Sequence, residues 1–158
     1  MFRRKTTITR PDRDRLIEVT RAKGNTLRWA IFIDDLQREL DRARVVDPSR
    51  VSRDVVTMDS TVRFLDLRND RREVYTLVYP DEADLSAGKL SVLSPLGTAL
   101  LGARAGDVVS VLSATGPRAI KIESILHQPE AQQRSQPCNA SKLVLAEYAA
   151  GSTNERND

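Results

Sequence analysis

The sequence has very few of the residues on which metal binding and nucleophilic catalysis depend. Its 158 residues include one cysteine, Cys138, one histidine, His127, and only 4% aromatic side chains. A single cysteine excludes an internal disulfide framework and a thiolate-based structural zinc site. A single histidine excludes a His-rich metal centre. The sequence therefore predicts no catalytic residue, no metal and no cofactor.

Long apolar runs are also missing. No stretch approaches the ~20 residues that a membrane-spanning helix needs, and the N-terminus lacks the apolar core of a signal peptide. We therefore expect a cytoplasmic protein with no membrane partner. The chain is 40% hydrophobic with a net charge of +3, which favours a folded protein, because disordered chains combine few apolar residues with high net charge.

The small net charge hides an uneven distribution. Residues 1–53 carry 14 basic and 8 acidic side chains, whereas residues 54–130 carry 8 basic and 11 acidic ones. The most compact basic run consists of Arg3, Arg4, Lys5 and Arg10. Such a segment could bind nucleic acid weakly through phosphate contacts, which gives an alternative function for the chain. Solvated arginines are the simpler interpretation, since no groove-reading motif accompanies them.

The first third of the chain predicts two antiparallel helices. Thr9 and Pro11 are typical of a helix start, and Gly24 with Asn25 predicts a helix end, since both residues tolerate left-handed backbone conformations. The apolar residues of the second helix recur at spacings of three and four: Trp29, Ile33, Leu36, Leu40 and Ala43. This spacing is typical of a coiled-coil seam, so residues 10–46 should form a helical hairpin.

The start of the second helix is apolar on nearly every side. Five consecutive apolar residues run from Trp29 to Ile33, which is more than a two-helix hairpin can cover by itself. Either a further element of the chain or another molecule covers them. Self-association is the simplest version of the second possibility.

Residues 54–127 change to a period of two, which is typical of β-strands. The expected strands are Val62 to Phe64, Glu73 to Tyr79, Lys89 to Leu93, Val108 to Leu112 and Ala119 to Leu126. One short helix interrupts them, with Ser94 as its N-cap and Pro95 at its first position. This succession predicts a small antiparallel α+β domain.

We therefore expect an α+β protein in three parts. Residues 1–50 form the helical hairpin, and residues 51–130 form the β domain. Residues 131–158 have the composition of a linker and tail, either disordered or folded into one short helix.

The order of motifs from Val55 to Gln128 resembles the C-terminal domain of the bacterial Gre transcription elongation factors, GreA and GreB. The segments that carry this resemblance are Val62 to Phe64, Tyr75 to Val78, Gly88 to Gly97 and Gly102 to Val109. The segments Arg53 to Ser60 and Leu77 to Pro80, with the short hairpin before them, look most like the compact Rnk-type members of this family, the regulators of nucleoside diphosphate kinase.

The resemblance implies an FKBP-like C-terminal domain behind an N-terminal coiled-coil hairpin. It also implies docking on RNA polymerase, with the C-terminal domain on the rim of the secondary channel and the hairpin entering that channel. The residues that match the family's docking loop and helix start are Ser94, Pro95, Leu96 and Gly97. These four residues are the expected contacts with the polymerase.

The hairpin tip departs from the family pattern. Transcript-cleavage factors carry acidic tip residues that help to hold a catalytic metal, whereas the tip of this chain has no carboxylate. Its residues include Arg21, Lys23, Gly24 and Asn25. Asp34 and Asp35 follow about two turns further along the second helix. We therefore expect a protein that competes with Gre-type factors without stimulating transcript cleavage.

An FKBP-like shape also raises prolyl isomerase activity as an alternative. That chemistry needs an aromatic-lined pocket for the proline ring, and the domain offers only Phe64, Tyr75 and Tyr79. Fold analogy alone does not establish function, so we expect no enzyme activity.

Overall fold

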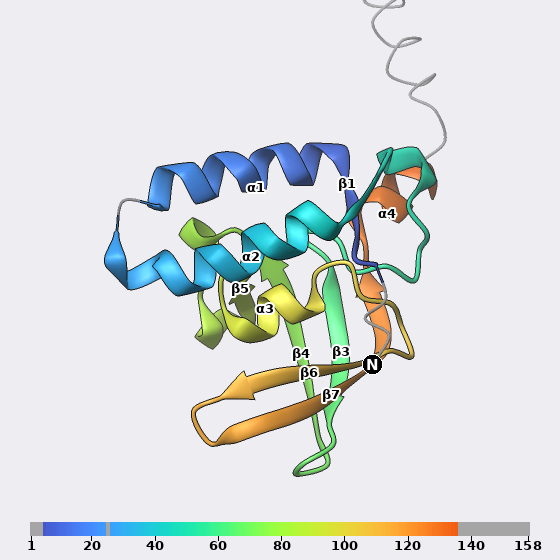
Figure 1. Cartoon of the computed structure of the whole chain (residues 1–158). Helices are drawn as coiled ribbons and strands as arrows, with labels where there is room; N and C mark the ends of the chain where they lie inside the picture. The colour runs from blue at the N-terminus through green and yellow to red at the C-terminus, as the bar shows by residue number, and fades with distance from the viewer. Residues whose placement is uncertain (1–4, 25, 136–158) are drawn as a thin grey trace, which may run out of the picture.

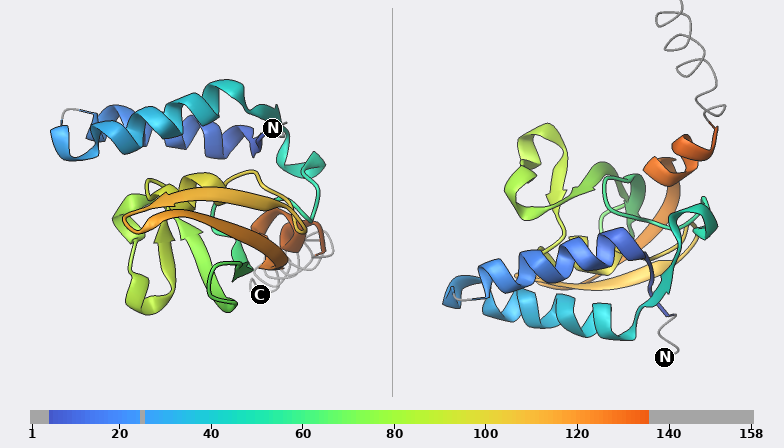
Figure 2. Two further views of the ribbon diagram at one scale, coloured as in Figure 1. Left: turned by 60° about the horizontal axis from the view of Figure 1, so that its bottom comes forward. Right: turned by 90° about the horizontal axis from the view of Figure 1, so that it is seen from above.

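Two layers make up the structure: a helical hairpin lies over one side of a curled β-sheet (Figure 2). The computed structural model describes residues 5–24 and 26–135 of the chain. Side chains from both layers belong to the same hydrophobic core. The α+β class expected from the sequence is confirmed, and the hairpin is packed against the β domain.

The hairpin consists of α1 (Arg10–Lys23) and α2 (Ala30–Arg42), which lie side by side in Figure 1. The side chain of Thr9 caps α1 as expected, because its hydroxyl oxygen accepts the Asp12 N–H at 3.4 Å. The helix end expected at Gly24 is confirmed, since α1 ends at Lys23, and Gly24 itself has a right-handed φ of −63°. A 3₁₀ turn then leads into α2.

The predicted apolar seam of the hairpin faces the core. Leu16 on α1 is buried, as are Ile33, Leu36 and Leu40 on α2. Against this seam lies α3 (Pro95–Leu100), which also contacts the sheet. Burial of these side chains holds the hairpin in place, at about 1.5–3 kcal/mol for each large apolar residue.

A short parallel ladder closes the base of the hairpin, and the sequence did not predict it. It pairs β1 (Thr7–Thr9) with β2 (Arg44–Val46). The Arg44 N–H also donates to the Thr6 carbonyl oxygen at 2.7 Å. The two chain segments that flank the helices are therefore fixed to each other.

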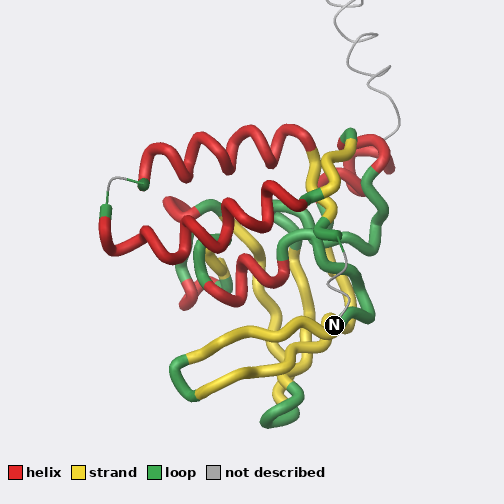
Figure 3. The backbone as a smooth tube through the Cα atoms, viewed as in Figure 1, coloured by secondary structure: helices red, strands yellow, loops and turns green. Residues whose placement is uncertain are grey.

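The larger sheet has the strand order β5-β4-β3-β7-β6. Its strands are β3 (Thr61–Asp66), β4 (Arg71–Val78), β5 (Lys89–Ser91), β6 (Val108–Ser113) and β7 (Gly116–His127). Neighbours pair antiparallel, as expected, except that β5 runs parallel to β4. Figure 3 shows these strands, in yellow, below the helices.

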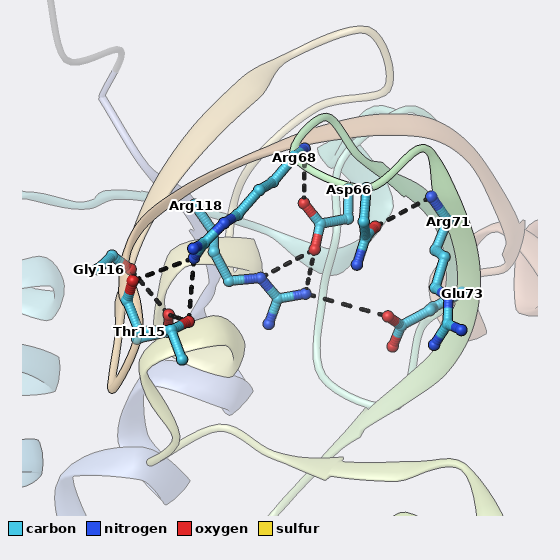
Figure 4. A network of polar contacts seen from close by, with 9 residues as sticks. Asp66, Arg68, Arg71, Glu73, Thr115, Gly116 and Arg118 are labelled. Carbon is cyan, nitrogen blue, oxygen red and sulfur yellow. Dashed lines mark hydrogen bonds and ion pairs between the residues drawn. The ribbon is translucent and has the colours of Figure 1, made fainter.

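A polar network connects the β3–β4 turn with the β6–β7 turn (Figure 4). The carboxylate of Asp66 is 1% exposed and accepts from Arg118 Nε at 2.9 Å and from the Arg68 N–H at 2.9 Å. Arg68 Nη1 reaches across to the Thr115 carbonyl oxygen at 3.1 Å. Hydrogen bonds from the Arg68 N–H and from Arg118 lower the pKa of Asp66. The network fastens the β3–β4 turn to the β6–β7 turn.

The last described element is α4 (Pro129–Ser135), which begins next to the domain boundary expected at residue 130. Its buried Glu130 accepts a hydrogen bond from the Thr57 hydroxyl at 2.7 Å, and Gln128 Nε2 donates to the Val55 carbonyl oxygen at 2.8 Å. The remainder of the expected tail, residues 136–158, lies outside the described residues.

Candidate functional site

The four residues expected to contact a partner are the N-cap of α3, Ser94, and the first three residues of that helix, Pro95, Leu96 and Gly97. Ser94 Oγ accepts the Gly97 N–H at 3.0 Å and donates to the Ser91 carbonyl oxygen at 2.6 Å. The Thr98 hydroxyl donates to the Val92 carbonyl oxygen at 2.8 Å. These bonds fix the first turn of α3 against the preceding strand.

The four expected contact residues differ in what they present to solvent. Pro95 is exposed and Ser94 is half-buried. Leu96 is half-buried against the core, and Gly97 is buried. A Cβ atom on Gly97 would lie 2.0 Å from the Ser91 carbonyl oxygen, so no side chain fits there. Pro95 is therefore the best placed of the four to meet a partner, while Leu96 and Gly97 hold the turn.

The hairpin tip is basic, and part of it is tied to the β domain. Arg21 and Gly24 are exposed, whereas Lys23 is half-buried and its Nζ lies 3.0 Å from Asp81 Oδ1. Asn25 lies outside the described residues. Beyond it, the exposed Arg28 lies over the Trp29 ring at 5.7 Å. The tip thus presents arginines and no carboxylate of its own.

Side chains that could support metal or nucleophilic chemistry are scattered. Asp34 is exposed and pairs with Arg38 at 2.7 Å, and Asp35 is exposed beside it. His127 is exposed at the end of β7, and Cys138 lies outside the described residues. Within residues 5–24 and 26–135, no three His, Cys, Asp or Glu side chains are placed to hold a metal ion. The same residues contain no helix that could span a membrane.

A junction between α1 and the β domain was missed by sequence reasoning. The ring of Tyr79 is buried, and the guanidinium of Arg15 stacks on it at 4.1 Å from the ring centroid. The Tyr79 hydroxyl donates to Asp12 Oδ1 at 3.4 Å, and the Met58 N–H donates to Asp12 Oδ2 at 3.3 Å. No local signal in the sequence connects Tyr79 with Asp12, which lies 67 residues away along the chain.

Burial at this junction opposes the charge on both acidic groups. It raises the pKa of Asp12 to about 6, and the nearby Glu130 carboxylate adds to that rise. Burial and the carboxylate of Asp12 also raise the pKa of the Tyr79 hydroxyl. The tyrosine therefore keeps its proton and remains a hydrogen-bond donor to Asp12.

The apolar start of α2 is covered mainly by the protein itself. Trp29 and Phe32 pack against the core with ring centroids 6.3 Å apart, and Ile33 is buried. Ile31 remains 75% exposed, and Leu27 in the turn before it is 95% exposed. A further element of the chain thus covers most of this segment, and two apolar side chains face solvent near the tip.

The basic N-terminal run falls only partly within the described residues. Lys5 and Arg10 are exposed, whereas Arg3 and Arg4 lie outside the described residues. The structure therefore shows that two residues of this basic run, Lys5 and Arg10, are exposed.

A hairpin packed over a curled sheet, with a capped helix start, fits the family that the sequence motifs resemble. Residues 51–127 match the family of transcription elongation factors GreA/GreB in its C-terminal part. The chain also aligns with a 41% identical relative over 99 residues, 73% of that relative's length. The chain belongs to the GreA/GreB family.

The relatives have two kinds of name. The 41% identical protein is the "Regulator of nucleoside diphosphate kinase" of Escherichia coli K12, matched over 62% of this chain. The "Transcription elongation factor GreA" of Thermodesulfovibrio yellowstonii is 40% identical over 79 residues, which is 50% of each chain. The chain thus spans about half the length of that GreA relative.

A solved structure shares the fold. The GreA/GreB factor from Nitrosomonas europaea is 36% identical and superposes with a TM-score of 0.65. The match covers all of that chain and 78% of this one.

Proposed function

We propose that this protein is a non-enzymatic transcription regulator that binds RNA polymerase near the secondary channel and competes with Gre-type factors without stimulating transcript cleavage. The observation that carries the proposal is the basic hairpin tip. Arg21 is exposed there, Lys23 is held by Asp81, and the tip sequence contains no carboxylate. Such a tip can occupy a channel but offers no carboxylate oxygen to a metal ion.

The surface proposed to meet the polymerase is the exposed start of α3. Ser94 caps this helix, and the tight packing of Gly97 fixes its direction, so Pro95 is presented outward on a rigid turn. A rigid contact residue loses little conformational entropy on binding, which favours affinity. The names of the relatives, elongation factor and regulator, support a role in transcription.

The alternative function, weak nucleic-acid binding through the N-terminal segment, is favoured only by the exposure of Lys5 and Arg10. It requires steeply salt-dependent binding of nucleic acid by the protein without polymerase. The first proposal requires polymerase, so the two are separable.

Competition for purified RNA polymerase tests the first proposal. A labelled GreA-type factor is bound to the polymerase, and the unlabelled protein is added in increasing amounts. We expect displacement by the native chain and at least about tenfold weaker displacement by Pro95→Glu, equivalent to about 1.4 kcal/mol. Glutamate suits the first turn of a helix, so this variant alters the surface of α3 while keeping its fold.

Pro11→Glu is the matched control for this experiment. Pro11 is likewise an exposed proline in the first turn of a helix, but it lies on α1. The Pro11→Glu variant should displace the labelled factor as well as the native chain does. Absence of displacement at micromolar concentrations of the native chain, or equal weakening by both variants, would contradict the proposal.

A further inference from the structure

A hollow at the base of the hairpin collects positive charge. It has a volume of about 420 Å³ and lies beside the β1–β2 ladder. Four arginines contribute to its lining: Arg10, Arg44, Arg50 and Arg104. They come from the start of α1, from β2 and the turn after it, and from the loop between α3 and β6. The fold, and not a basic run in the sequence, brings them together.

Three of these four guanidinium groups have no side-chain partner among the described residues. Arg104 Nη1 lies 3.6 Å from Asp54 Oδ2, at the edge of ion-pair distance. In the part of the chain that the structure describes, the side chains of Arg10, Arg44 and Arg50 form no ion pair or hydrogen bond. Their donors are therefore available to a ligand.

Little negative charge offsets this cluster. Asp47 is the carboxylate that contributes to the lining, and its Oδ1 already accepts from the Ser49 N–H at 3.4 Å and from the Ser49 hydroxyl at 3.3 Å. Like charges brought to one hollow repel one another, which costs stability. An anion bound among them would remove that repulsion.

The chemistry of the lining favours phosphate. Guanidinium groups bind phosphate oxygens through paired, charge-assisted hydrogen bonds, and the hydroxyl-bearing residues Thr7 and Ser52 also line the hollow. The half-buried Val46 adds apolar surface. The volume lies within the range of roughly 300–1,000 Å³ that is typical of small-molecule sites.

We propose that this hollow binds a small ligand with two or more phosphate groups, the class that includes nucleoside diphosphates and triphosphates. A single phosphate would neutralise only part of the charge of the three arginines that lack an ion pair among the described residues. Pro95 is not among the residues that line this hollow, so the site is separate from the proposed contact of Pro95 with polymerase.

Calorimetric titration of the full chain with inorganic triphosphate tests the proposal in the absence of polymerase. We expect saturable binding that weakens at least about tenfold in the double variant Arg44→Gln/Arg50→Gln. Both arginines are exposed, so the fold should tolerate glutamine. A nucleoside diphosphate should compete with triphosphate for the site.

The matched control removes two positive charges elsewhere. In Arg63→Gln/Arg71→Gln the two exposed arginines lie on β3 and β4, outside the hollow, and binding of triphosphate should change less than about twofold. Equal weakening in both double variants would overturn the proposal, because bulk charge would then explain the binding. It would also be overturned by absence of saturable binding at millimolar triphosphate.

Discussion

Asp12 is the residue at which stability and pH are most directly coupled. Burial raises the pKa of its carboxyl group to about 6 from 3.8, and Glu130 contributes to the rise. Because the folded pKa lies above the unfolded value, the folded state favours the protonated form. The contribution of the Asp12 carboxyl group to stability is therefore fully present below pH 3.8 and is lost as the pH rises through about 6.

Asp12→Asn should therefore stabilise the protein at neutral and alkaline pH. An asparagine can accept from the Met58 N–H and donate to the Tyr79 hydroxyl oxygen, so both contacts survive without a buried charge. We expect a gain of about 1–3 kcal/mol in the free energy of unfolding at pH 8, measured by urea denaturation. The gain should shrink toward pH 4.

Asp14→Asn is the control for this prediction. Asp14 lies on the same helix but is exposed, so its substitution should leave the unfolding free energy within about 0.5 kcal/mol at every pH. A loss of stability in Asp12→Asn at pH 8, or a gain that does not depend on pH, would contradict the account of the junction.

Single residues were predictable where their role is local. Thr9 and Ser94 were identified as helix caps because a cap bonds to an N–H only three residues away. The contact of Asp12 with Tyr79 spans 67 residues, and only the packed structure brings them together. The same holds for the pair of Lys23 with Asp81, which lies 58 residues further along the chain.

At the scale of elements, α3 depends on a position that tolerates no side chain. A Cβ atom on Gly97 would lie 2.0 Å from the Ser91 carbonyl oxygen and 2.9 Å from Val92 Cα, both backbone atoms. Gly97→Ala should therefore force α3 away from β5 and cost about 3 kcal/mol or more. Thermal or urea unfolding of the purified variant measures this loss.

Gly24→Ala is the matched substitution at another glycine. Gly24 already has a right-handed φ of −63°, and its added Cβ would lie 3.0 Å from the Thr20 carbonyl oxygen. We expect a change of less than about 1 kcal/mol there. If Gly97→Ala lowers the free energy of unfolding no more than Gly24→Ala does, the tight packing of the turn that presents Pro95 is contradicted.

Elements were predictable where turns separate clear periodic segments, and less so where pairing is non-local. The two helices and all five strands of the large sheet were expected near their observed positions. The parallel pairing of β5 with β4 and the β1–β2 ladder were not expected. Strands as short as Thr7–Thr9 and Arg44–Val46 carry no periodic signal, and their register follows from how the hairpin packs.

At the scale of the whole molecule, the hairpin and the sheet share one core. The expected hairpin and the expected β domain both contribute to it, since the buried Leu16 and Leu36 lie in the same cluster as Phe64 and Ile122. The hairpin and the start of α3 are thus held in one relative position. This arrangement supports the proposed function, in which the protein acts by occupying a surface of the polymerase.

RNA cleavage by a stalled polymerase complex tests that central claim most directly. The labelled transcript is followed with this protein alone, with a GreA-type factor alone, and with both together. The account predicts no cleavage above background with the protein alone, and a dose-dependent decrease of the cleavage that the GreA-type factor stimulates. Cleavage stimulated by this protein itself, or full activity of the factor at saturating protein, would contradict it.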